Sequence, residues 1–321
     1  MATSIRIALM AAFGLLPLAA LPLAALAQAY PAKPIRVIVG PGPDSLARVF
    51  GQKFTEDWGQ PVIVDQRGGG GGTISSEVVA RSPGDGYTLL LATGTHTINQ
   101  SLYKLPYEIG KELIPVTLLG ITPFVLGVHP SVPVKSVAEL LQYAKAKPEA
   151  LNYGTGGQGT PPHLATELMK SMAGVQMAHI PYKTVPEAIS DLVAGRLQVM
   201  FMVGPAGLPQ IQAGKVRGLA VSQGKRSVFA PDLPTVAESG LPGYDVSGWN
   251  GLLAPGTTPR AIVQKVRDEV AALVKQPDVR ASMAKFGFEP VADTPEEFGE
   301  FLRRDIAQWA KVAKESGAKV D

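Results

Sequence analysis

Two short segments rich in glycine and threonine are the parts of the sequence best suited to bind an anion. The first, Thr93-Gly94-Thr95-His96-Thr97, follows an apolar run at 87–92, and the second, residues 153–160, leads into His163. Hydroxyl groups and unpaired backbone amides hydrogen-bond oxygen-rich anions without a formal positive charge. Both segments follow predicted strands, where open α/β sheets bind their ligands. Ordinary turn and capping chemistry is the alternative for each single residue.

Five consecutive glycines at 68–72 raise the alternative of a nucleotide-binding loop. A phosphate-binding loop requires G-x-x-x-x-G-K-[ST], and Gly-Lys-Ser/Thr occurs nowhere in the chain. A dinucleotide fingerprint follows the first strand, whereas these glycines follow the second predicted strand. We therefore expect no nucleotide or other cofactor, and we interpret the run as a turn that opens a helix.

The residues that usually carry catalysis or bind metals are not arranged for either role. Cysteine is absent, and the four histidines, at 96, 129, 163 and 179, form no H-E-x-x-H or other close metal spacing. No G-x-S-x-G sequence marks a nucleophile elbow. We expect neither a metal site nor catalytic residues. His163, near a predicted helix start, is expected to cap or pack, with holding an anion as the alternative.

Apolar runs alternate with helical spacings along most of the chain. Buried strands are predicted at 35–39, 61–64, 87–92, 151–153, 177–182, 197–202 and 218–222. Amphipathic helices are predicted between them, and the two clearest helices open at Thr258-Pro259 and Thr294-Pro295. This alternation predicts an α/β fold with mostly parallel sheets covered by helices.

No long linker separates the two halves of the chain, so two lobes would be joined by crossing strands. The candidate crossings are residues 118–128 outward and residues 244–253 back. Tyr244 and Trp249 lie in the return crossing, where they either line a cleft or fill a core. The chain is long enough for two lobes of about 100–150 residues each.

The N-terminus has the pattern of a secretory signal peptide. Arg6 precedes an apolar run that ends at Ala27-Gln28-Ala29. We expect cleavage after Ala29, with Ala27 as the alternative site and a transmembrane anchor as the alternative interpretation. Without cysteine the mature chain cannot be lipidated, so we expect it to be untethered in a Gram-negative periplasm. A net charge of +3 with mixed signs indicates no nucleic-acid or membrane-surface partner.

The order of several segments resembles the Bug family, the extracytoplasmic solute receptors of tripartite tricarboxylate transporters. The resemblance covers the chain after the signal peptide. Its motifs are YPAKPIRVIV, GQPVIVDQR, DGYTLLLAT with GTHTINQSLY, LNYGTGGQGTPPHLATELMKSMAG, HIPYKTVPEAISDLVAGRLQVMF, PTVAESGLPGYDVSGWNGLLAP and TPEEFGEFLRRDIAQWAKV.

The resemblance implies a periplasmic Venus-flytrap fold that closes on a small carboxylated ligand. Residues 1–29 would be the signal peptide, residues 30–125 plus 250–321 one lobe, and residues 126–249 the other. The ligand positions it implies are Gly42, Asp44, Ser45, Thr93, Thr95, His96, Thr155, Gly156, Thr160, His163, Tyr182 and Met202. The implied partners are membrane permease subunits, with a sensor kinase as the alternative, and the protein would be a monomer.

Two departures from the family pattern concern the ligand. The segment GPGPDSLAR is about three residues shorter than the usual loop of the type PFPPGGATD. Phe201-Met202-Val203 replaces a frequent Phe-Asp-Asn, so an acidic partner for an ammonium group is missing. We therefore expect a plain or more apolar carboxylate rather than an amino acid. The alternatives are a sensor, a receptor that has lost binding, and an enzyme on the same fold.

Overall fold

The computed structural model describes residues 30–40 and 44–316. The predicted signal peptide, residues 1–29, and the predicted ligand residue Gly42 lie outside the described residues. Within the described ranges, none of the helices combines the length and the apolar character needed to cross a membrane.

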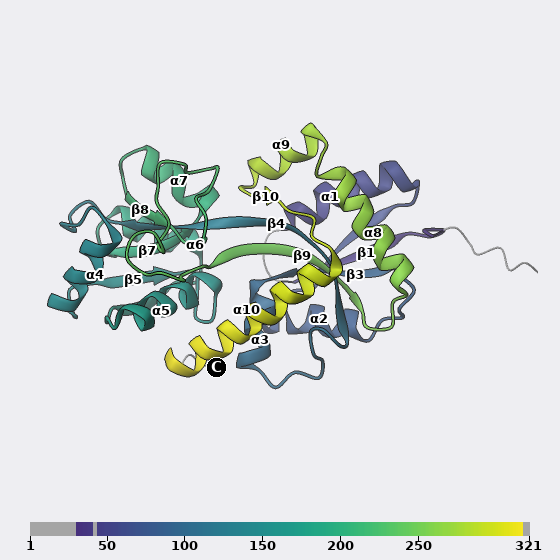
Figure 1. The fold of residues 1–321 in the computed structure, drawn as a ribbon, viewed down its shortest axis with the longest axis horizontal. Coiled ribbons are helices and arrows are strands. Elements are labelled where there is room, and N and C mark those ends of the chain that lie inside the picture. The colour runs from purple at the N-terminus through teal and green to yellow at the C-terminus, as the bar shows by residue number, and fades with distance from the viewer. Residues whose placement is uncertain (1–29, 41–43, 317–321) are drawn as a thin grey trace, which may run out of the picture.

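Strands and helices alternate along the described chain, which confirms the predicted α/β class (Figure 1). The strands are β1 (Ile35–Val39), β2 (Val62–Gln66), β3 (Thr88–Thr93), β4 (Leu113–Val128), β5 (Asn152–Thr155), β6 (Ala178–Pro181), β7 (Val199–Val203), β8 (Arg217–Val221), β9 (Ser247–Pro255) and β10 (Glu289–Pro290).

Helices occupy most of the intervals between these strands. They are α1 (Ser45–Trp58), the 3-10 turn η1 (Gly70–Gly72), α2 (Thr73–Ala80), α3 (Gly94–Leu102), α4 (Val137–Ala146), α5 (Pro161–Ala173), α6 (Val185–Val193), α7 (Gly204–Gln212), α8 (Arg260–Leu273), α9 (Pro277–Lys285) and α10 (Pro295–Ser316). Local chemistry marks the ends of several helices. Ser136 accepts from the Glu139 amide at the start of α4, and Gly59 ends α1 in the left-handed conformation.

Eight of the described strands form one path in the order β2-β1-β3-β9-β4-β7-β5-β6, and β8 and β10 each pair with β4 off this path. The outer pairs are parallel, as predicted: β1 with β2 and β3, and β5 with β6 and β7. The pairs made by β4 and β9 are antiparallel, because the chain runs out along one and back along the other. The sheet is therefore mixed, with antiparallel pairing confined to its middle and to the short strand β10.

Strand β4 passes through both parts of the sheet. Its residues 113–123 pair with β9, and its residues 124–128 pair with β7 and β8. Figure 1 shows β4 and β9 running side by side between two groups of helices and strands. The predicted crossings at 118–128 and 244–253 fall largely within these two strands. Tyr244, just before β9, is fully buried in an apolar core.

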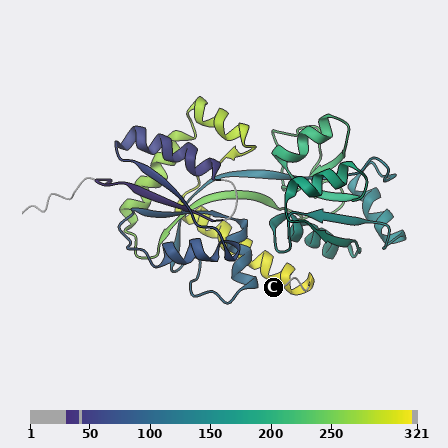
Figure 2. The same ribbon diagram turned by 180° about the vertical axis from the view of Figure 1, so that it is seen from behind.

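Helix α10 packs against both groups of elements. Phe298 and Leu302, in its first half, are buried with residues of β3, β4 and β9. Trp309 and Val312, in its second half, are buried with residues of β5 and α5. Figures 1 and 2 show this yellow helix extending from one group toward the other. Its apolar face thus connects the two cores.

The segment after β3 differs from the prediction. The glycine- and threonine-rich residues 93–97 are typical of a loop, but helix α3 begins at Gly94 and Thr93 is its N-cap residue. Glycine and threonine have low helix propensity, so the local signal for this helix is weak. The helix is held by tertiary packing, because Ile98 is completely buried in an apolar cluster.

The crossing strand β9 leaves no room for a side chain at Gly251. A Cβ atom at this position would lie 2.3 Å from the ring of Phe298, which is itself fully buried. We predict that Gly251→Ala lowers the free energy of unfolding by about 1–3 kcal/mol, because the ring must leave its packed position. Urea denaturation followed by circular dichroism measures this change.

Gly68→Ala is the matched control, because nothing lies within 4 Å of a Cβ atom there. Its free energy of unfolding should stay within about 0.5 kcal/mol of the parent value. Equal stability of the two variants would contradict the packing described for β9.

Candidate functional site

Three segments meet at the start of α3. Strands β1 and β3 are neighbours and parallel, so both end at the same edge of the sheet. A Cβ atom on Gly40, directly after β1, would lie 2.9 Å from Ser75 Oγ and 3.3 Å from His96 Nε2. The end of β1, the helix α2 and the first turn of α3 are therefore in contact.

His96 presents a neutral ring N–H at this meeting point. The Thr93 amide donates to His96 Nδ1 at 3.0 Å, which places the ring proton on Nε2. Burial lowers the pKa of His96 to about 4, so the imidazole carries no charge at pH 7. Nε2 is buried and has no hydrogen-bond partner among the described residues. A buried donor without a partner is destabilising by about 1–3 kcal/mol, so the position favours a ligand acceptor.

The second glycine- and threonine-rich segment forms a hydrogen-bonded loop between β5 and α5. The Gly157 carbonyl accepts from Thr155 Oγ1 at 3.0 Å and from Thr160 Oγ1 at 2.8 Å. The Gly159 amide donates to His163 Nδ1 at 3.1 Å, so His163 holds the loop from the first turn of α5. The loop is thus shaped by its own hydroxyl groups and by one buried histidine.

The two predicted anion-binding segments lie next to each other, although residues 98–152 separate them in the sequence. A Cβ atom on Gly94, the first residue of α3, would lie 3.5 Å from Pro161 Cγ, at the first residue of α5. It would also lie 3.4 Å from Trp249 Nε1 on β9. The starts of α3 and α5 therefore face each other beside a crossing strand.

These two helix starts differ in the amides that they can offer. Helix α3 begins with Gly94 and Thr95, which carry N–H groups in the first turn. Helix α5 begins with two prolines, Pro161 and Pro162, which have none. The positive end of α3 is therefore the better amide donor for an anion.

The other predicted ligand positions lie in different surroundings. Asp44 precedes α1, and its carboxylate accepts from Arg48 Nε at 2.9 Å and Nη2 at 2.6 Å. Ser45 is the first residue of α1. Tyr182 donates its hydroxyl to Asp191 at 2.7 Å, so its side chain points to α6. Among the contacts described above, none brings these three side chains to the His96 group.

Met202 is not a surface residue in this structure, contrary to the expectation that it lines the ligand site. Its side chain is 0% exposed and packs with Met200, Leu197 and Val216 in an apolar cluster. Successive residues of a strand face opposite sides, and Phe201 faces the other core. The position of Met202 therefore gives no reason to expect that amino acids are disfavoured as ligands.

Sequence reasoning missed a buried acid behind the first segment. Asp305 on α10 lies 2.5 Å from Thr97 Oγ1 and accepts from Trp249 Nε1 at 3.2 Å. Thr97 Oγ1 also lies 2.8 Å from the Gly94 carbonyl, so two acceptors compete for its single hydroxyl hydrogen. Burial raises the pKa of Asp305 to about 6. The available signal was an acid on the apolar face of α10, one turn before Trp309.

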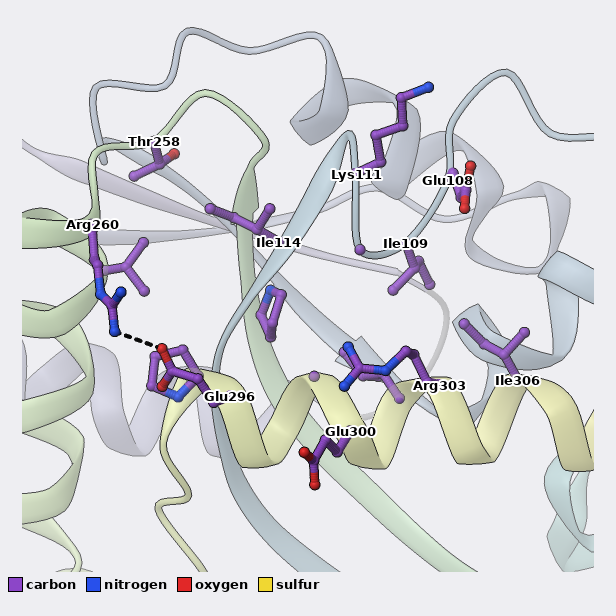
Figure 3. Close-up of a pocket in the computed structure, with 16 residues that line it drawn as sticks. Glu108, Ile109, Lys111, Ile114, Thr258, Arg260, Glu296, Glu300, Arg303 and Ile306 are labelled. Carbon is purple, nitrogen blue, oxygen red and sulfur yellow. Dashed lines mark hydrogen bonds and ion pairs between the residues drawn. The ribbon is translucent and has the colours of Figure 1, made fainter.

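A separate groove of about 680 Å³ lies between the segment 108–115, the start of α8 and the first half of α10 (Figure 3). Arg260 and Glu296 form an ion pair at 2.8 Å on its rim, and Arg303 projects from α10. None of the predicted ligand residues lines this groove. It is therefore distinct from the candidate site at the starts of α3 and α5.

Comparisons with known proteins agree on one family. A protein-family model with the description tripartite tricarboxylate transporter family receptor matches residues 46–318 of this chain. Protein BugT of Bordetella pertussis is 36% identical over 302 residues, which are 92% of each chain. The solved structure of Rpa4515 of R. palustris with adipate is 34% identical with a TM-score of 0.77, covering 91% of this chain and 100% of that one. The solved structure of MatC from Rhodopseudomonas palustris with bound malate is 30% identical with a TM-score of 0.73. The match covers 88% of this chain and 99% of that one.

The raised pKa of Asp305 predicts a pH dependence of stability. Its folded pKa of about 6 exceeds the ordinary value of 3.8, so the folded state keeps a proton that the unfolded state has lost. This contribution is complete below pH 3.8 and is lost as the pH rises through 6, by about 3 kcal/mol in total. Asp305→Asn, which cannot titrate, should therefore gain stability relative to the parent between pH 4 and pH 8.

Urea denaturation of both proteins at these two pH values measures the difference. Asp232→Asn in an exposed loop is the matched control, and its effect should change little with pH. A pH-independent effect of Asp305→Asn would show that the buried acid is ionised throughout.

Proposed function

This chain belongs to the family of receptors of tripartite tricarboxylate transporters, as its sequence motifs predicted, and from that premise we propose that it captures a small carboxylate between its two lobes. The observation that carries the proposal is the buried Nε2–H of His96, which has no partner among the described residues and lies at the edge where β1, α2 and α3 meet. The family consists of periplasmic solute-binding receptors. Capture without chemical conversion is the corresponding proposal for this chain.

The chemistry of the proposed site suits a carboxylate. A carboxylate oxygen would accept from His96 Nε2, and the amides at the start of α3 would share its charge. Because the imidazole is neutral at pH 7, binding requires no buried counter-charge. The relatives solved with adipate and malate hold dicarboxylates, which supports the same ligand class here.

We further propose the lobe boundaries at residues 30–125 plus 250–321 and 126–249. Strands β4 and β9 would act as the hinge, because they are the long strands that run between the two groups of elements in Figure 1. The contact between Gly94 and Pro161 brings one helix start from each lobe to the same point. A ligand there would contact both lobes and favour the closed form.

Export and partners follow from the family and from the N-terminal sequence. We propose that residues 1–29 direct the chain to the periplasm and are removed, leaving an untethered monomer. The closed, ligand-bound form would be recognised by the membrane subunits of the transporter. A sensor that receives the same closed form is the alternative partner, and the binding chemistry is common to both.

The proposal predicts which compounds bind and which residue they need. Isothermal titration of the purified mature protein should detect binding of adipate, malate or succinate. His96→Leu should weaken dicarboxylate binding about 10- to 100-fold, because a charge-assisted hydrogen bond contributes about 1.5–3 kcal/mol. His96→Gln, which keeps an N–H donor, should retain most of the affinity.

His129→Leu is the matched control, because this histidine bonds Ser131 away from the proposed site. Its affinity should equal that of the parent. Failure of every dicarboxylate to bind, or parental affinity in His96→Leu, would contradict the proposal.

A further inference from the structure

A stack of three rings lies directly behind the loop between β5 and α5. His163 and His179 are 4.2 Å apart between ring centroids, and Tyr153 lies 4.8 Å from His179. The rings come from α5, β6 and β5, respectively. The interplanar angles of 25° and 18° make both contacts stacked. The stack therefore joins three elements at the base of the loop.

One member of this stack hydrogen-bonds the loop itself. His179 Nε2 lies 2.7 Å from Thr155 Oγ1, and Thr155 is completely buried. Thr155 Oγ1 also lies 3.0 Å from the Gly157 carbonyl and 3.2 Å from the Gly157 amide. A carbonyl can only accept and an amide N–H can only donate. With the hydroxyl hydrogen of Thr155 directed to the carbonyl, His179 donates to Thr155 from Nε2.

The surroundings of the stack keep the His179 ring neutral, so only one of its two ring nitrogens carries a hydrogen. Burial lowers the pKa of His179 to about 4, with His163 adding to the effect. Glu167, the acid nearest the stack, accepts from the Tyr153 hydroxyl and from Lys170 Nζ at 2.6 Å. Lys170 thus balances the charge of Glu167. At pH 7 the neutral His179 ring therefore donates its Nε2–H to Thr155 Oγ1.

The Gly157 peptide has an unusual backbone conformation that its hydrogen bonds stabilise. Gly157 has φ +132, a conformation that side-chain-bearing residues rarely adopt, and its amide and carbonyl are both bonded to Thr155. The same carbonyl accepts from Thr160, directly before α5. The orientation of the whole loop from 155 to 160 is thereby linked to one donor on β6.

We propose that His179 is a positioning residue for ligand binding, which acts through Thr155 to hold the Gly157 peptide and the loop. This inference rests on the proposed function, because it assumes that the loop contacts a carboxylate. His179 itself does not contact the ligand. It sets the geometry in which the loop meets the start of α3.

Two substitutions separate the hydrogen bond from the stacking. His179→Phe keeps an aromatic ring but loses the donor, and His179→Gln keeps an N–H donor at similar reach but loses the ring. Adipate titration should show about 10-fold weaker binding for His179→Phe and less than 3-fold weaker binding for His179→Gln. The opposite order, or parental affinity in both, would overturn the proposal.

Thr155→Val should weaken adipate binding as much as His179→Phe, and the double variant should be no weaker than either one. Additive losses would contradict a shared path through Thr155. Thermal unfolding by circular dichroism identifies variants that have not folded.

Hydrogen exchange of the Gly157 amide supplies a readout that needs no ligand. His179→Phe should accelerate this exchange about 10-fold, and His179→Gln should leave it near the parental rate. If no dicarboxylate binds the parent protein, the proposed function fails. The exchange rate of the Gly157 amide still tests whether His179 holds the loop. Unchanged exchange in His179→Phe would show that the loop does not depend on it.

Discussion

Backbone pairing between β4 and β9 determines how the remaining elements are arranged. β4 pairs with β9 over residues 113–123 and with β7 and β8 over residues 124–128, so one strand belongs to both parts of the sheet. β9 in turn pairs with β3, whose end leads into α3. The start of α3 and the start of α5 then meet beside Trp249. Any relative movement of the two groups of helices and strands must bend the paired strands β4 and β9. It must also shift α10, which packs on both groups.

The candidate site and the loop beside it depend on neutral hydrogen-bond donors that buried polar groups hold in place. His96 and His179 are both neutral at pH 7, because burial lowers the pKa of each ring to about 4. Each is oriented by a threonine in a glycine-containing segment, Thr93 in one case and Thr155 in the other. Asp305 supports the first segment from behind. Preorganised neutral donors can bind a carboxylate without the desolvation penalty of a buried cation.

Much of the fold was predictable because it depends on local patterns. Apolar runs identified most of the strands, and the helix caps at Ser136 and Gly59 were predictable from residue type. Helix α3 was not predicted, since its glycine and threonines favour a loop and only tertiary packing makes it helical. The burial of Met202 depends on which face of β7 it occupies. The His179–Thr155 bond joins residues on different strands, and no local pattern in the sequence indicates it.

The central claim is that one carboxylate is held jointly by the starts of α3 and α5. A crystal structure of the mature protein with a bound dicarboxylate such as adipate tests this claim most directly. We expect a carboxylate oxygen within hydrogen-bond distance of His96 Nε2 and of the α3 amides, with further contacts from the loop 155–160. A dicarboxylate in the groove of Figure 3, or one that contacts a single lobe and leaves His96 Nε2 without an acceptor, would contradict it.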